Sequence, residues 1–190
     1  MDHVLSNASI NVEDKHSHEV ITALIQLYST KVMHLEKLFN FNDFYNTLIG
    51  GVCDEAGFSM KPTVFFIGAY STGKTTFIKN LLGKSYPEMN ISPEPSSDKF
   101  NVIINGDDDI VLSGAVATGL PGSPFNTLSD FGLDFVNKMV TTTVRSSILT
   151  KINLIDSPGI LSGVKQSINR GYDFCAVVRW FAHRSDLILL

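Results

Sequence analysis

The sequence has few cysteines, no excess of basic residues and no long apolar run. Its two cysteines, Cys53 and Cys175, are far apart, so neither a disulfide framework nor a zinc site is expected. Lys and Arg number 15 against 19 Asp and Glu, which argues against binding to nucleic acid. No apolar stretch reaches the roughly 20 residues of a membrane-spanning helix, and the N-terminus has no signal-peptide core. The composition therefore indicates a cytoplasmic globular protein, for which any membrane contact is peripheral.

The most informative stretch is a glycine loop at residues 68–76, Gly-Ala-Tyr-Ser-Thr-Gly-Lys-Thr-Thr. It fits the pattern G-x-x-x-x-G-K-[ST], whose backbone N–H groups surround the phosphates of a nucleoside triphosphate. A β-branched and aromatic run at residues 63–67 predicts a buried strand before the loop. Residues 76–82 predict a helix after it, ending at Gly83. This context favours a phosphate site over the alternative, an ordinary glycine turn before a helix.

Each residue type in the loop suits that chemistry. Gly68 and Gly73 allow the backbone to approach the phosphates and to adopt unusual dihedral angles. Lys74 is expected to reach the β- and γ-phosphates, and the hydroxyl of Thr75 to ligate Mg²⁺. We expect Thr76 to place a second hydroxyl near the α-phosphate.

A second motif follows the apolar run at residues 151–155, where Asp156-Ser157-Pro158-Gly159 has the form D-x-x-G. An Asp at the carboxyl end of a strand can face the metal ion, and the Gly159 amide can sense the γ-phosphate. Alone, the segment fits a plain β-turn equally well. Combined with the glycine loop, it predicts a second phosphate-site element.

Residues 86–98 lie between the two motifs and contain three prolines, which predicts a loop. This loop occupies the position of a first switch, where a hydroxyl would reach Mg²⁺ and position the attacking water. Ser96 and Ser97 are the available hydroxyls. A simple connector is the alternative.

The rest of the pattern predicts alternating helices and strands. Residues 1–16 form a polar tail, expected to be disordered, and an apolar helical stripe starts at Ser17, followed by a short helical piece at 41–49. Residues 100–105 and 110–112 predict two strands joined by the acidic turn at 106–109. Its aspartates could be taken for metal ligands, but a solvated hairpin turn is favoured over a metal site. Further helices are expected at 125–140, with Phe131 and Phe135 inward, and at 165–184, with Phe174, Val177, Val178 and Phe181 buried; a strand is expected at 186–190.

Several of these stretches resemble the EH-domain-containing (EHD) ATPases of the dynamin superfamily. They are residues 61–78, 91–98, 156–163 and 170–174, and Gln26-Leu27-Tyr28 and Leu35-Glu36 sit where that family's first helix lies. The resemblance implies an α/β P-loop domain of GTPase-like topology at 61–190, preceded by part of a helical domain at 17–60. It also implies a domain truncated at its C-terminus, with the base-reading loop, lipid-contacting helices and EH domain absent. The last strand would then be an unpaired edge, and we expect poor solubility or association through residues 186–190.

The resemblance further implies slow, Mg²⁺-dependent ATP hydrolysis by a protein that dimerises through its nucleotide-binding domain and oligomerises on endosomal or plasma membranes to remodel them. Partners with Asn-Pro-Phe motifs are expected only if an EH domain exists beyond this chain. A GTP-binding dynamin-type GTPase and a nucleotide-locked scaffold without turnover remain alternatives, because phosphate motifs do not distinguish adenine from guanine. The candidate nucleotide-binding residues are Gly68, Ser71, Thr72, Gly73, Lys74, Thr75, Thr76 and Gly159; the candidate catalytic residues are Ser71, Lys74 and Ser97; the candidate metal ligands are Thr75, Ser97 and Asp156.

The chain also departs from the family pattern. Serines stand at Ser96 and Ser97, and at Ser157, where the family usually has threonines. Serine keeps the oxygen but lacks the methyl group that stiffens the side chain, so we expect the metal ligand to be less firmly fixed. Ala69 replaces a residue that is typically Gln, with no obvious consequence for phosphate binding.

Overall fold

The computed structural model describes residues 16–41, 60–89, 99–120, 123–160 and 170–190. The chain divides into two compact units, residues 1–60 and residues 61–190, and each is described by itself. Three expectations fall wholly or largely outside the described residues: the disordered tail, the helical piece at 41–49, and the switch loop that contains Ser96 and Ser97.

The described part of the first unit is a helix. Residues 16–27 are α-helical, followed by the π-helical η1 (Tyr28–Val32) and by α2 (Met33–Leu38). Tyr28 is buried, and its hydroxyl donates to a carboxylate oxygen of Glu36 at 2.6 Å. The predicted helix is therefore present, but the apolar stripe that predicted it is largely exposed, as at Leu24, Leu27 and Leu35.

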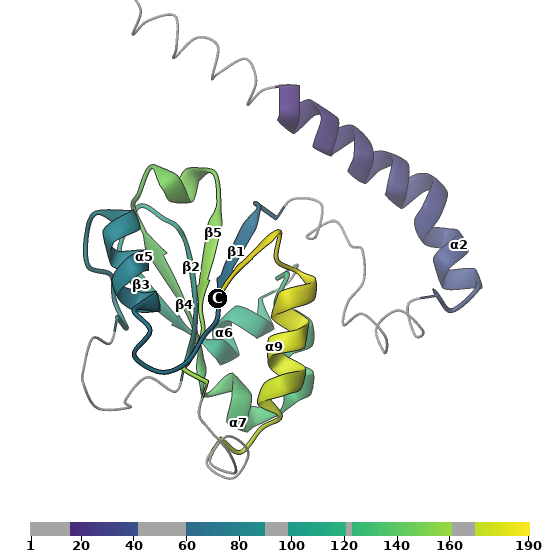
Figure 1. Ribbon diagram of the computed structural model, residues 1–190. Helices are drawn as coiled ribbons and strands as arrows, with labels where there is room; N and C mark the ends of the chain where they lie inside the picture. The colour runs from purple at the N-terminus through teal and green to yellow at the C-terminus, as the bar shows by residue number, and fades with distance from the viewer. Residues whose placement is uncertain (1–15, 42–59, 90–98, 121–122, 161–169) are drawn as a thin grey trace, which may run out of the picture. The chain divides into compact units, whose positions relative to one another are not determined.

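In the described residues of the second unit, six strands form one sheet in the order β3-β4-β2-β5-β1-β6. The strands are β1 (Thr63–Phe66), β2 (Phe100–Asn105), β3 (Ile110–Ser113), β4 (Met139–Val144), β5 (Asn153–Asp156) and β6 (Leu187–Leu189). The helices are α5 (Lys74–Leu82), α6 (Gly114–Gly119), α7 (Leu133–Val136) and α9 (Phe174–His183), with α5 on one side of the sheet and α6, α7 and α9 on the other (Figure 1). The predicted α/β fold class is confirmed.

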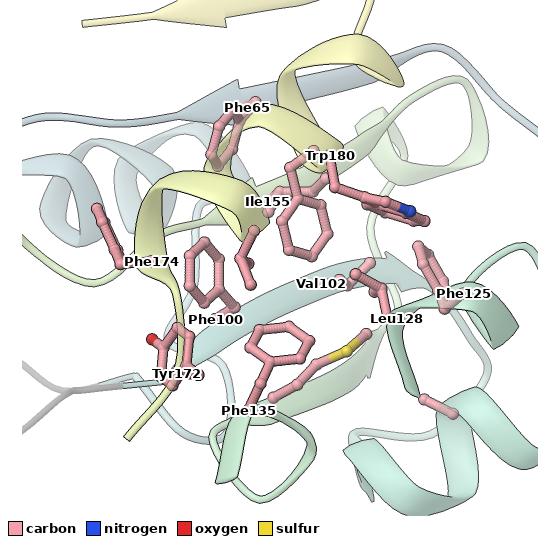
Figure 2. Packing of buried hydrophobic residues seen from close by; sticks show 14 residues of the cluster. Phe65, Phe100, Val102, Phe125, Leu128, Phe135, Ile155, Tyr172, Phe174 and Trp180 are labelled. Carbon is pink, nitrogen blue, oxygen red and sulfur yellow. The ribbon is translucent and has the colours of Figure 1, made fainter. Parts of the chain in front are cut away.

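Alternate residues of the strands pack into two separate hydrophobic cores, because successive side chains of a strand point to opposite faces of the sheet. Phe65 and Phe100 belong to an aromatic core beneath α7 and α9 (Figure 2). The ring of Phe100 lies 5.1 Å from that of Phe181 and 5.8 Å from those of Phe135 and Phe174. On the other face, Phe66, Ile103 and Leu154 pack with α5 residues Ile78 and Leu82. This second core fixes α5 over the sheet and so positions the loop that precedes it.

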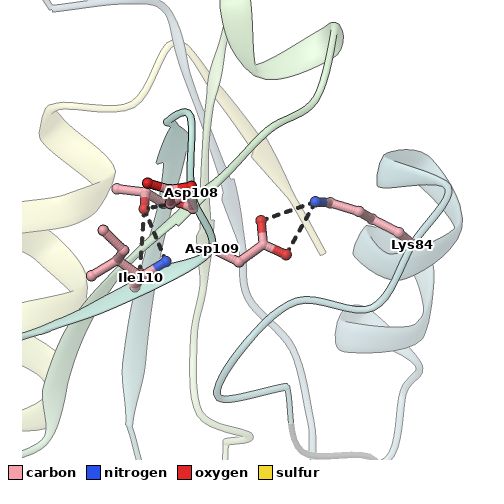
Figure 3. Close-up of polar contacts among 5 residues, drawn as sticks. Lys84, Asp108, Asp109 and Ile110 are labelled. Carbon is pink, nitrogen blue, oxygen red and sulfur yellow. Dashed lines mark hydrogen bonds and ion pairs between the residues drawn. The ribbon is translucent and has the colours of Figure 1, made fainter.

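The predicted hairpin at residues 106–109 is wrong, because β4 lies between β2 and β3. β3 pairs antiparallel with β4, and the hydroxyl of Thr143 in β4 accepts from the Ile110 amide at 3.1 Å and donates to the Asp108 carbonyl at 2.6 Å. The turn is nevertheless solvated, and the Asp109 carboxylate accepts from Lys84 Nζ at 2.9 Å (Figure 3). Among the described residues, no three or more His, Cys, Asp or Glu side chains form a group that could hold a metal ion.

The prediction of one continuous helix at 125–140 is also wrong, because the segment contains two short helices and the start of a strand. A 3-10 helix, η2 (Asn126–Phe131), ends at Gly132, whose φ of 87° breaks the helical path, and only the short α7 follows. Residues from Met139 onward form β4, as suits the β-branched run of residues 140–144. Phe135 is fully buried and Phe131 packs against the aromatic core, so both point inward as expected.

The last predicted helix is shorter than expected, because residues 170–173 are not helical and α9 begins at Phe174. Asp173 sets this start, since its carboxylate accepts from the Ala176 amide at 3.0 Å as an N-cap. The predicted burial of Phe174, Val177 and Phe181 is confirmed, whereas Val178 is partly buried. The predicted strand at 186–190 is present as β6, which pairs parallel with β1.

Candidate phosphate and metal site

The loop between β1 and α5 turns sharply toward the start of the helix. Ser71 and Gly73 have φ of 61° and 89°, and the Thr72 hydroxyl donates to the Ala69 carbonyl at 2.9 Å across the turn. Gly73 is the N-cap of α5 and accepts from the Phe77 amide at 2.8 Å, and no side chain of the described residues caps the helix. The N–H groups of the first turn are therefore not used by a capping side chain, and the positive end of the helix dipole suits an anion there.

Lys74 lies across this loop. Its ammonium group donates to the carbonyls of Gly68 at 3.1 Å and Ala69 at 2.9 Å. Burial lowers the pKa of Lys74, and the negative charge of Asp156 raises it in return. An ammonium has three N–H groups, so the two bonds hold the side chain in place while one donor can still serve a phosphate oxygen.

Asp156 meets the loop because β5 is parallel to β1, and Asp156 pairs with Phe66 at the carboxyl ends of both strands. The Thr75 hydroxyl donates to Oδ2 of Asp156 at 2.7 Å, which joins two motifs 81 positions apart in the sequence. The other oxygen, Oδ1, is buried and has no hydrogen-bond partner among the described residues. Burial raises the pKa of Asp156, whereas the Thr75 hydrogen bond and the charge of Lys74 lower it.

These groups fit a magnesium ion. A hydroxyl and a carboxylate are hard oxygen donors of the kind that Mg²⁺ prefers, usually with few protein ligands and several waters. The Asp156 oxygen without a protein partner is a group that a cation, or water bound to it, would satisfy. Thr75 and Asp156 are the described residues that would hold the ion.

Gly159 lies where the D-x-x-G motif packs against the glycine loop. A Cβ at this position would lie 2.7 Å from Cα and 2.9 Å from the amide nitrogen of Tyr70, so only glycine fits without displacement. The Ile160 amide donates to the Gly68 carbonyl at 2.9 Å, beside a parallel bridge between Ala69 and Ile160. The two motifs therefore form one continuous surface at the ends of β1 and β5.

Two residues of this surface were not among the sequence candidates. The Tyr86 hydroxyl donates to Asp156 Oδ2 at 3.3 Å, and burial together with the charge of Asp156 raises the pKa of Tyr86. Arg170 is buried, its Nη2 donates to the Gly159 carbonyl at 2.7 Å, and its guanidinium lies 4.2 Å from the centre of the Phe174 ring. The sequence signals were weak: Tyr86 opens the proline-rich loop, and Arg170 opens a run similar to the EHD family.

The structure brings together most of the predicted site residues but describes only part of the predicted site. Around the loop lie Gly68, Ser71, Thr72, Gly73, Lys74, Thr75 and Thr76, with Asp156 and Gly159 beside them. Thr76 is exposed in the first turn of α5. Ser97, the predicted catalytic hydroxyl and third metal ligand, lies outside the described residues.

Among known proteins, the chain is similar to EH domain-containing proteins. No family model matches the chain. EH domain-containing protein 3 of Rattus norvegicus is 43% identical over 171 residues, which are 90% of this chain and 31% of that protein. EH domain-containing protein 1 of Homo sapiens is 42% identical over the same length, with the same coverage. The chain thus spans about a third of the length of the curated relatives that it matches.

Solved structures give a weaker result. Two chains of an oligomerised bacterial dynamin pair, described as sensing and tethering membranes over long range, cover 72% and 73% of this chain and 28% of their own length. Their TM-scores are 0.38 and 0.36 at 15% and 13% identity, which is too low to support an argument.

Proposed function

Since the chain belongs to the EH-domain-containing protein family, we propose that its second unit is a P-loop domain that binds ATP with Mg²⁺ and hydrolyses it slowly. The observation that supports this most is the hydrogen bond of 2.7 Å between Thr75 and Asp156. It places the hydroxyl of the glycine loop and the carboxylate of the D-x-x-G motif at one point, next to Lys74. A chance glycine turn would have no reason to meet a buried carboxylate 81 positions away.

The proposed mechanism is positioning combined with electrostatic stabilisation. Lys74 and the loop amides would bind the β- and γ-phosphates and offset the charge that develops on them. Thr75 and Asp156 would hold Mg²⁺, which would withdraw charge from the γ-phosphoryl group when bound. Ser97 would hold the attacking water, Ser71 would contact the bridging oxygen, and Gly159 would sense the γ-phosphate through its amide. We nominate no general base, because no carboxylate of the two motifs is in an obvious position for that role.

On the cellular scale, we propose a peripheral membrane protein that oligomerises through the nucleotide-binding domain and remodels membranes in endocytic trafficking. Support comes from the resemblance to the EHD family, with relatives that are 42–43% identical over 90% of this chain. Within the described residues, no helix is both long and apolar enough to cross a bilayer. Binding of Asn-Pro-Phe partners is proposed only for a protein that also contains an EH domain.

Turnover is tested by single-turnover hydrolysis of ATP on liposomes, comparing the wild-type chain with Lys74→Ala and with Lys84→Ala as a control. Lys84 forms an exposed ion pair with Asp109 outside the site, so its removal should leave turnover unchanged. Hydrolysis that is lost only in Lys74→Ala supports the proposal. No hydrolysis by the wild-type chain, with nucleotide still bound, would favour a nucleotide-locked scaffold.

Two further measurements refine the assignment. Competition of ATP and GTP for a fluorescent triphosphate analogue determines the base preference; stronger competition by GTP would replace the ATPase assignment with a GTPase. Ser97→Ala should leave nucleotide binding largely intact and lower turnover. If turnover is unchanged, the role proposed for Ser97 is wrong.

A further inference from the structure

Tyr86 is a buried tyrosine whose ring and hydroxyl have separate surroundings. The ring packs in the second core with Phe66, Ile78 and Leu82, and only 5% of the residue is exposed. The hydroxyl instead donates to Asp156 Oδ2 at 3.3 Å. A phenylalanine ring would fill the same space in the core, so packing alone does not require the oxygen atom.

The two oxygens of Asp156 are used differently. Oδ2 accepts from both Thr75 and Tyr86, at 2.7 and 3.3 Å, whereas Oδ1 has no partner among the described residues. Two donors on one oxygen restrict rotation of the carboxylate about its last bond. They therefore determine which oxygen remains for a cation, in the way that outer hydrogen bonds orient metal ligands in general.

The position of Tyr86 in the chain gives this bond a second consequence. Tyr86 follows α5 and is the first residue of the proline-rich segment that contains Ser96 and Ser97. Its hydroxyl thus connects the start of that segment directly to the carboxylate of the D-x-x-G motif. Thr75, at the start of α5, completes a set in which three separate segments meet at one carboxylate oxygen.

We infer that Tyr86 is a positioning residue for magnesium: its hydroxyl holds the Asp156 carboxylate so that Oδ1 is presented, with the Thr75 hydroxyl, to the divalent cation of a bound triphosphate. This role depends on the nucleotide site proposed above and extends it to a residue that contacts the carboxylate of Asp156. It acts through Asp156.

The test is Tyr86→Phe, which removes one oxygen and keeps the ring. The measurement is binding of a fluorescent ATP analogue as Mg²⁺ is titrated, and again in EDTA without Mg²⁺. We expect the Mg²⁺ concentration at half-maximal binding to rise roughly three- to tenfold, the size of one ordinary hydrogen bond, because 3.3 Å is long for a hydroxyl donor. Affinity in EDTA should not change, because the phosphate loop and Lys74 are untouched.

Two controls separate this role from a structural one. Tyr28→Phe removes another buried tyrosine hydroxyl bonded to a carboxylate, at 2.6 Å from Glu36, and should leave both binding measurements unchanged. In an Asp156→Asn background, Tyr86→Phe should have no further effect on the response to Mg²⁺. An additional effect there would show that Tyr86 does not act through Asp156.

The outcomes are distinct. A wild-type response to Mg²⁺ in Tyr86→Phe, or an equal loss of affinity with and without Mg²⁺, would refute the role of Tyr86 and leave the proposed function standing. No binding by the wild-type chain under either condition would refute the proposed function and this inference together.

Discussion

Adding one methyl group at Gly159 should separate the two halves of the candidate site. In Gly159→Ala, the new Cβ would lie 2.7 Å from Tyr70 Cα, whereas ordinary contact begins at about 3.4 Å, so one backbone must move by about 0.7 Å. Both sides are held in place: the Ile160 amide donates to Gly68 at 2.9 Å, and Arg170 donates to the Gly159 carbonyl at 2.7 Å. Overpacking of this kind typically costs about 1–3 kcal/mol.

The expected result is a free energy of unfolding lower by about 1–3 kcal/mol. Nucleotide affinity should also fall by roughly tenfold, which corresponds to about 1.4 kcal/mol. Urea denaturation can be followed by the fluorescence of Trp180, the one tryptophan of the chain, which is buried in the aromatic core. Affinity is measured with the fluorescent ATP analogue in the presence of Mg²⁺.

The matched control is Gly119→Ala, also a single added methyl group. Within the part of the chain that the structure describes, no atom lies within 4 Å of a Cβ at Gly119, the last residue of α6. This variant should be unchanged or more stable by up to about 1 kcal/mol, because alanine favours the helix. If Gly159→Ala matches Gly119→Ala in both stability and affinity, the close approach of the two motifs has no functional importance and the reasoning is wrong.

Asp156→Asn should weaken Mg²⁺-dependent nucleotide binding yet stabilise the nucleotide-free chain near pH 7. Burial raises the pKa of Asp156 above its ordinary 3.8, because the interior favours the protonated form. The contribution of Asp156 to the free energy of unfolding is therefore fully present below pH 3.8 and is lost as the pH rises through the raised pKa. Urea denaturation at a series of pH values should show that Asp156→Asn gains free energy of unfolding near pH 7, about 1.4 kcal/mol for each unit by which the pKa of Asp156 is raised. If the variant gains none at any pH, this prediction is wrong. Thr142→Val removes the hydroxyl that donates to buried Asn101 Oδ1 at 2.8 Å, and should lower the free energy of unfolding by about 1–3 kcal/mol. Most of this loss should be recovered when Asn101 is also replaced by leucine. A single variant as stable as the wild type would contradict this. Lys84→Ala breaks an ion pair with Asp109 whose side chains are 38% and 41% exposed, so a loss above about 1 kcal/mol in the same assay would be unexpected.

Much of the fold could be predicted where local patterns determine it. Strands β1, β2, β3, β5 and β6 and helix α5 correspond to apolar runs and to a glycine stop at Gly83, which has a φ of 70°. Strand pairing could not be predicted in the same way. β2 and β3 are close in sequence, but β4 lies between them. Its first two residues, Met139 and Val140, fell within the helix predicted at 125–140, and its Thr-rich run was given no assignment. Pairing depends on contacts between distant segments, which a local pattern does not contain.

The site shows the same division. The glycine loop and the D-x-x-G segment are visible as strings, and their meeting follows from the parallel pairing of β1 with β5. Tyr86 and Arg170 were missed because their sequence neighbours say nothing of Asp156 or Gly159, which they contact only in the folded chain. The roles of all the candidate site residues, Lys74, Thr75 and Asp156 as well as Ser71, Thr76 and Ser97, stay predictions.

The most direct test of the central claim is calorimetric titration of the chain with ATP and, separately, GTP in the presence of Mg²⁺, repeated with Lys74→Ala. The nucleotide site described above predicts saturable heat with at least one triphosphate, stronger for ATP, and its loss in Lys74→Ala. No heat with either triphosphate, or the same heat in Lys74→Ala, would contradict the account.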